Sequence, residues 1–530
     1  MRKKSKTIRI YKRAGLKISI AHNIRKHIKK TKNKFIGILD IKIFKTSIMF
    51  CFFLRIPSKF KIYKILRKYD IIITNPKSLN FVVTHYEQIL QWLNSKEFKE
   101  QYINTNHPYP PLLNPRRLKD LKYRTKENQE SQNIQPYTNL SYQTISAELA
   151  WDLNLPLPRG YKSIWLYNSC SGGEAIQTFF EICNVEFCTI IWRFKDYKNA
   201  FLYLYRSYLQ GKYIIFSLNN WQNGAKKFAS LLDKKVPIFC ICRDPISRIK
   251  TVVNHLDNPS WNIESFKNFT LKSKIIFPTM YYRGVFRTKP DVSIIGENIS
   301  FAFPPNELGS IVTRLEWLKN ATSKVIFISI DEISGKNTFD TFLKLSQDLA
   351  FTLPSNNSKV FEGRVNRYEG LIMLPCILNA NTKDIDEKAE EAKVKIIIST
   401  HQLTPNTNKN LYNITPLIGI KMPQDNMILY TNDFKTLSEN TLLLRSVKVY
   451  LQKYMQELER YMADIKANLV SEKDILQYLE NNPNVMLDLK QTLQADMNLI
   501  KQMRPDIVET WKHYQEFERM YISKENENIL

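Results

Sequence analysis

The strongest constraint on the fold is a repeated alternation of short apolar runs and amphipathic segments between residues 161 and 350. Five runs rich in Ile, Val and Phe have the length of strands that are buried on both faces. These runs are Ser163–Tyr167, Phe187–Trp192, Tyr213–Leu218, Val236–Cys242 and Lys324–Ile330. Between them, apolar residues recur at helical spacing. This pattern predicts an α/β fold with three layers, in which a parallel sheet carries helices on both faces.

One strand of this pattern ends in a sequence that suits anion binding. The run Val236–Cys242 stops at Arg243, which is followed by Asp244 and Pro245. Asp is a favoured N-cap and Pro is favoured in the first helical turn, so a helix is expected from here to about residue 255. Arg243 thus lies at the carboxyl end of a strand, where open α/β sheets bind ligands, and its guanidinium can hold a phosphate in a bidentate manner. Thr251 offers a hydroxyl from the second turn of that helix.

A second candidate loop follows the first strand. The sequence Asn-Ser-Cys-Ser-Gly-Gly places Ser169, Ser171, Gly172 and Gly173 between a strand and the start of a helix. Glycines let the backbone approach a phosphate, and the N–H groups of a first helical turn can cradle it. The loop lacks the Walker A pattern GxxxxGK[ST], and the chain has no GxGxxG sequence. An ordinary tight turn is the simpler alternative for this loop.

Taken together, the two loops resemble the donor site of sulfotransferases that use 3′-phosphoadenosine 5′-phosphosulfate. In that family the first loop holds the 5′-phosphosulfate, and an Arg and a Ser eight residues apart bind the 3′-phosphate. The resemblance implies that Arg243 and Thr251 bind the 3′-phosphate, and that Asp331–Ile333 forms the turn after a late strand. It also implies that Asp196 is the catalytic base and that Lys195 stabilises charge on the leaving phosphate. The resemblance covers residues 161–354.

The sequence departs from the sulfotransferase pattern in its first loop. The family carries there a Lys that steadies the leaving phosphate, whereas this chain has Cys170 or Ser171. Loss of a charge aimed at a transition state typically costs orders of magnitude in rate. Lys195 and Arg193, at the end of the second strand, are the two candidates to supply this charge. His255 and His401 are alternatives to Asp196 as the base.

The chain is also similar to an uncharacterised bacterial family that is associated with surface-polysaccharide (capsule) genes and loosely described as sugar transferases. Three sequence segments carry this resemblance: Tyr109–Pro115, Ala147–Pro158 and Arg504–Phe517. The two resemblances leave three functions open. The first is sulfuryl transfer to a hydroxyl of a surface glycan or glycolipid. The others are transfer of a glycosyl or other nucleotide-activated group in capsule biosynthesis, and a non-catalytic role in membrane-associated assembly.

Positive charge is concentrated at the N-terminus. The net charge of the chain is +28, and residues 1–70 account for +20 of it (22 Lys and Arg against 2 Asp). The segment Phe60–Leu66 alternates bulky apolar residues with Lys, as in a basic helix on an anionic membrane. We therefore expect residues 1–65 to bind an anionic membrane surface; a poorly ordered extension is the alternative. Nucleic acid is a weaker candidate, because aromatic residues are not interleaved with the basic ones.

The expected domains are a basic extension (1–70), a helical lead-in and linker (71–150), the α/β core (151–433) and a helical C-terminal subdomain (434–530). Val394–Ser399 is either a sixth strand of the core or the start of a separate lobe. The seven Cys include no CxxC pair and the seven His have no ligand spacing, so we expect reduced thiols and no metal site. The expected location is the cytoplasm, peripheral to the inner face of the membrane.

Overall fold

The computed structural model describes residues 49, 60–69, 71–118, 137–189, 194, 196–218, 224–256, 263–282, 287–296, 311–354, 358–362, 371–400 and 411–526. The chain divides into two compact units, Met1–Leu157 and Pro158–Leu530. Most of the basic extension, together with the linker at 119–136, lies outside the described residues. Among the described residues, no helix combines the length and the apolar character that crossing a membrane requires.

The described part of the first unit is helical. Its elements are α2 (Phe60–Lys68), α3 (Pro76–Thr84), α4 (Tyr86–Asn94), α5 (Lys96–Phe98), η2 (Lys99–Ile103), η3 (Pro115–Arg117) and α6 (Ala147–Asp152). Trp92 and Phe98 pack edge to face in its core, and Trp92 Nε1 donates to the carbonyl of Pro111 at 3.0 Å. In α2, the apolar side chains of Ile62 and Leu66 are fully buried. The apolar face of this basic helix is therefore already covered by protein.

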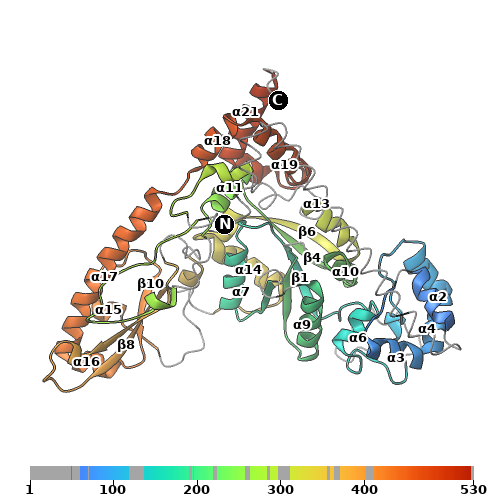
Figure 1. Ribbon diagram of the computed structural model, residues 1–530, viewed down its shortest axis with the longest axis horizontal. Helices are drawn as coiled ribbons and strands as arrows, with labels where there is room; N and C mark the ends of the chain where they lie inside the picture. Colours follow the sequence, from blue (N-terminus) through green and yellow to red (C-terminus); the bar gives the residue numbers. More distant parts are fainter. Residues whose placement is uncertain are drawn as a thin grey trace, which may run out of the picture. The chain divides into compact units, whose positions relative to one another are not determined.

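The second unit contains the predicted parallel sheet (Figure 1). Its strands are β1 (Tyr161–Leu166), β2 (Phe187–Thr189), β3 (Ile214–Ser217), β4 (Val236–Cys242) and β6 (Thr322–Ser329). They are arranged in the order β2-β3-β1-β4-β6, and every neighbouring pair is parallel. The α/β class and the parallel sheet are thus confirmed. From the central strand β1, the chain first builds the side of β3 and β2 and then crosses to β4.

Helices connect these strands. They are α7 (Gly173–Ile182), α9 (Tyr197–Leu209), α10 (Ala225–Ser230), α11 (Pro245–Val253), α13 (Ile311–Trp317) and α14 (Asn337–Leu349). One face of the sheet packs against α7 and α14 around Trp165, whose ring stacks on Phe239 at 4.6 Å between centroids. From β3, Phe216 packs edge to face on Phe228 of α10. Aromatic side chains therefore join the helices to the sheet.

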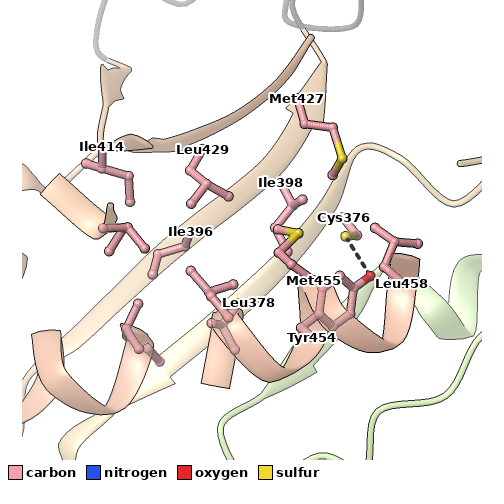
Figure 2. Packing of buried hydrophobic residues seen from close by; sticks show 14 of the residues in the cluster. Cys376, Leu378, Ile396, Ile398, Ile414, Met427, Leu429, Tyr454, Met455 and Leu458 are labelled. Atoms are coloured by element: carbon pink, nitrogen blue, oxygen red, sulfur yellow. Dashed lines mark hydrogen bonds between the residues drawn. The ribbon is translucent and has the colours of Figure 1, made fainter. Parts of the chain in front are cut away.

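A second, mixed five-stranded sheet lies in the same unit, with the order β5-β7-β8-β10-β9. Its strands are β5 (Asn268–Thr270), β7 (Cys376–Asn381), β8 (Lys393–Thr400), β9 (Tyr412–Asn413) and β10 (Met427–Thr431). The candidate strand Val394–Ser399 is β8, so it belongs to this sheet and not to the first one. Figure 2 shows the core of this sheet against the long helix α17 (Thr441–Ala467), where Cys376 Sγ lies 3.6 Å from the hydroxyl of Tyr454.

The remaining C-terminal helices pack near the first sheet. They are α18 (Glu472–Glu480), α19 (Pro483–Met503), α20 (Pro505–Glu509) and α21 (Lys512–Asn526). Of these, α18 and α21 contact α11, and α19 contacts α13. The shorter elements are η5 (Ile263–Phe266), η6 (Val292–Ile294), η7 (Lys319–Ala321), η8 (Ile330–Ile333), η9 (Ser358–Phe361), η10 (Thr382–Asp384), α15 (Thr415–Ile418) and α16 (Phe434–Glu439). Of the helices from residue 434 onward, α16 and α17 therefore pack on the second sheet, whereas α18, α19 and α21 pack on helices of the first sheet.

Candidate functional site

An open cleft lies at the carboxyl ends of β1 and β4. These strands are neighbours at the point where the order of the sheet reverses, and open α/β sheets bind ligands in the crevice at such a point. The cleft is open to solvent on one side, and its solvent-accessible volume is about 40 Å³. The residues that line it are Asn168, Ser171, Ile241, Cys242, Arg243, Pro245, Arg248, Ile311, Thr492, Leu493, Asp496, Met497 and Ile500. Its wall therefore combines both loops singled out from the sequence with residues of α19.

The loop after β1 is a tight turn in which a Cβ atom at either glycine would lie too close to a neighbouring side chain. Gly172 caps α7 with a φ of 99°, and a Cβ added there would lie 2.3 Å from Cδ1 of Ile330. A Cβ added at Gly173 would lie 2.2 Å from the ring of Tyr167. Cys170 also has a left-handed backbone, with a φ of 64°. Close packing and backbone conformation thus account for both glycines without any ligand.

The structure brings Arg243 to this loop. Its Nη1 donates a hydrogen bond of 2.9 Å to the carbonyl oxygen of Cys170. The side chain is half-buried, and this burial lowers the pKa of Arg243 from its ordinary value. The loop after β1 and the guanidinium after β4 therefore meet at one edge of the sheet, as the parallel arrangement predicts.

Two further arginines support the same loop, and neither was identified from the sequence. Arg248 of α11 is buried and donates from Nε to the carbonyl of Ser169 at 3.2 Å. Burial lowers its pKa to about 9. Arg314 of α13 is also buried; its Nη1 donates to the carbonyls of Tyr167 at 3.0 Å and Leu218 at 3.2 Å. A charged residue on the apolar face of a predicted helix was the available signal in both cases.

One carboxylate shares the cleft with the arginines. Asp496 of α19 accepts hydrogen bonds from the backbone N–H groups of Ile311 and Val312 at 3.1 and 3.2 Å. It therefore holds the start of α13 and interacts electrostatically with both Arg248 and Arg314. The sequence contained no local signal for this residue, because α19 is more than 240 positions away from β4.

The helix α11 begins at Asp244, as predicted. Its Oδ1 accepts from the N–H groups of Ile246 and Ser247, and its Oδ2 accepts from the N–H of Tyr514 at 3.2 Å. Asp244 thus fixes both the turn after Arg243 and the C-terminal helix α21. Burial of this carboxylate, which is 7% exposed, is compensated by these three hydrogen bonds.

The predicted partner of Arg243 lies elsewhere. The hydroxyl of Thr251 donates to the carbonyl of Ser247 at 3.0 Å, and Thr251 is not among the described residues that line the cleft. Next to it, Glu472 of α18 accepts from the hydroxyl of Ser247 at 3.0 Å and pairs with Lys250 at 2.6 Å. Glu472 also interacts electrostatically with Arg243, so a carboxylate acts on the guanidinium to which the resemblance assigns a phosphate.

The predicted catalytic residues do not gather at the cleft in the described part of the chain. Asp196 caps α9, where its carboxylate accepts from the N–H of Asn199 at 2.8 Å. Lys195, Arg193 and His401 lie outside the described residues. Nδ1 of His255 lies 2.8 Å from the carbonyl of Leu256 at the end of α11. Within the described residues, no group of three or more His, Cys, Asp or Glu is arranged to hold a metal ion.

The second unit is thus an α/β structure with a polar cleft at the switch point of its parallel sheet. Residues 327–523 match a family described as a protein of unknown function (DUF2972). This match runs from β6 to α21 and covers less than half of the chain. Comparison with curated proteins gives no match, and comparison with solved structures gives none either.

Proposed function

We propose that residues 158–530 form a group transferase that holds the phosphate of an activated donor in the cleft between β1 and β4. One observation carries this proposal: Arg243, Arg248 and Ser171 line the same cleft at the carboxyl ends of adjacent parallel strands. Guanidinium groups bind phosphate oxygens through paired N–H donors, and the hydroxyl adds one more donor. Arg243 and Arg248 would position the donor, and the group would move to an acceptor hydroxyl.

The order of the motifs supports a sulfuryl donor. In this form of the proposal, 3′-phosphoadenosine 5′-phosphosulfate binds with its 5′-phosphosulfate at the loop of Ser171 and its 3′-phosphate at Arg243, in a three-layer core of the sulfotransferase type. A hydroxyl of a glycan or glycolipid attacks sulfur, the bond between sulfur and the bridging oxygen breaks, and adenosine 3′,5′-bisphosphate leaves. The acceptor proton passes to a base, a role for which Asp196 remains a candidate only if it leaves its capping position.

A different observation favours a second candidate function, transfer of a group from a nucleotide diphosphate. Glu472 interacts electrostatically with Arg243 and accepts from Ser247, and Thr251 is engaged within its own helix. A donor without a second phosphate avoids this carboxylate. This favours transfer of a glycosyl or other group from a nucleotide diphosphate, a function consistent with capsule biosynthesis.

Calorimetric titration of the full chain tests the proposal. The ligands are adenosine 3′,5′-bisphosphate and a panel of nucleotide diphosphate sugars, each titrated into wild type, Arg243→Ala and Arg460→Ala. Arg460 is an exposed arginine of α17 and controls for the loss of a positive charge. Binding that Arg243→Ala abolishes and Arg460→Ala preserves supports the proposal, and the ligand that binds selects the donor. If no ligand binds wild type, the transferase proposal fails and a non-catalytic assembly role is left.

The basic extension would place this enzyme on an anionic membrane surface at the inner face of the cell membrane. The truncation that tests this should stop at residue 59, because Ile62 and Leu66 are buried in the structure. We expect the full chain, but not the truncated one, to sediment with vesicles that contain phosphatidylglycerol. Equal sedimentation of both proteins would contradict a role of residues 1–59 in membrane binding.

A further inference from the structure

Asp496 is a fixed part of the candidate donor site. Its side chain is half-buried on α19 and lines the cleft together with Arg243 and Arg248. Both carboxylate oxygens accept backbone N–H groups, from Ile311 at 3.1 Å and Val312 at 3.2 Å. The carboxylate is therefore held in the wall of the cleft by the first turn of α13.

The positive charge of the arginines is already balanced by neighbouring carboxylates. Asp496 interacts electrostatically with Arg248 and Arg314. The carboxylates that act on Arg243 are those of Glu472, Asp244 and Asp331. Three guanidinium groups and the ammonium of Lys250, which pairs with Glu472, thus lie among four carboxylates. A bound group with one negative charge gains the arginine hydrogen bonds, whereas a second negative charge would be added to an environment with no positive charge in excess.

We infer that Asp496 makes the cleft selective for a phosphate group with a single negative charge over a phosphate monoester dianion. Phosphodiesters and the esterified phosphates of nucleotide diphosphate sugars belong to the first class. This inference rests on the proposed phosphate-binding function. Repulsion between one additional negative charge and this carboxylate, partly screened by water, corresponds to a preference of about tenfold.

Two small probes that differ by one methyl group test the inference without any assumption about the nucleotide. At pH 8, methyl phosphate carries two negative charges, because its second pKa is about 6, and dimethyl phosphate carries one. Apparent dissociation constants are obtained from thermal stabilisation of the full chain at constant ionic strength. Asp496→Asn removes the charge and keeps an oxygen acceptor for α13, and Asp496→Ser provides a second uncharged acceptor if the first variant is unstable. Asp488→Asn, an exposed position on the same helix, is the matched control.

We expect wild type and Asp488→Asn to prefer dimethyl phosphate, and Asp496→Asn to shift the ratio of the two dissociation constants by about tenfold towards methyl phosphate. Arg243→Ala should weaken binding of both probes. Binding that depends on Arg243 but keeps the wild-type ratio in both Asp496 variants would overturn the inference and leave the proposed function intact, as would a wild-type preference for methyl phosphate. If no form of the protein binds either probe, the inference and the phosphate site both fail.

Discussion

Gly172 offers a quantitative test of why the loop after β1 contains glycines. Its φ of 99° is a left-handed conformation, which costs a residue with a Cβ about 1–2 kcal/mol. A new Cβ would also lie 2.3 Å from Cδ1 of Ile330, and overpacking of this kind costs about 1–3 kcal/mol. We therefore expect Gly172→Ala to lower the free energy of unfolding of residues 158–530 by about 2–5 kcal/mol, the sum of the two contributions.

The two contributions can be separated, because the Ile330→Val substitution removes the Cδ1 atom that the new Cβ would strike. In the Ile330→Val background, Gly172→Ala should cost only the backbone contribution of about 1–2 kcal/mol. Gly335→Ala is the control for that contribution, since Gly335 has a φ of 57° and nothing within 4 Å of its added Cβ. A favourable coupling of about 1–3 kcal/mol in the double-mutant cycle is therefore expected.

Pulse proteolysis across a urea series measures these differences, with the survival of peptides from β1 and β4 read by mass spectrometry. This readout follows the second unit alone, so that unfolding of the first unit does not distort the transition. If Gly172→Ala costs no more than Gly335→Ala, or costs the same with and without Ile330→Val, the contact with Ile330 is not the reason for the glycine. The steric explanation would then be refuted, and close approach of a ligand to the backbone would become the explanation for Gly172.

Substitutions at three other positions test the network around the cleft. Asp244→Ala should lower stability in urea by about 2 kcal/mol, because it removes a helix cap and leaves the N–H of Tyr514 without its acceptor. Asp244→Asn keeps the capping oxygen but has an NH2 group in place of Oδ2, so it should recover only the capping contribution and still leave the N–H of Tyr514 without an acceptor. Arg314→Met should cost about 3 kcal/mol or more, since it leaves buried carbonyls unpaired; a loss below 1 kcal/mol would contradict this. Burial raises the pKa of Glu472, but the hydrogen bond and charge of Lys250 outweigh it and hold that pKa below the ordinary value. The stabilisation that ionised Glu472 provides is therefore complete above the pKa of the unfolded state, about 4.3, and is lost as the pH falls through the lower pKa of the folded state. Glu472→Gln should make the loss of stability below about pH 4.3 less steep than in wild type.

Elements with strong local signals were predicted well. The strand Val236–Cys242 has the predicted bounds, and the helix after it begins at Pro245 with Asp244 as its N-cap, because Arg243, Asp244 and Pro245 mark this boundary in the sequence. The second sheet was not predicted as a unit. Its first two strands pair across a long separation, as in Phe269 with Leu378, and local patterns do not specify such pairing.

The candidate site was predictable only where topology dictates proximity. Parallel strands place their carboxyl ends at one edge, so the meeting of Arg243 with the loop at Cys170 followed from the strand pattern. The strand pattern did not predict the surroundings of Thr251. Its hydroxyl bonds to the carbonyl of Ser247, and the packing of α18 against α11 brings Glu472 to the side chain of Ser247. The contribution of Asp496 depends on tertiary packing of α19, which helical periodicity alone does not reveal.

The C-terminal motif that begins at Arg504 links the family match to the cleft. Arg504 donates to the carbonyl of Phe327 in β6 at 2.7 Å and pairs with Asp506 at 2.8 Å, so it fastens the end of α19 to the parallel sheet. The matched segment, residues 327–523, therefore contains the α19 residues that line the cleft and Arg504, which joins α19 to β6. It contains neither Arg243 nor the loop at Cys170. A match confined to this segment includes Asp496 and the rest of α19, but it does not reach Ser171, Arg243 or Arg248. The proposed phosphate site depends on these three residues, so the match to the C-terminal segment supports a common scaffold for α19 and not the proposed function.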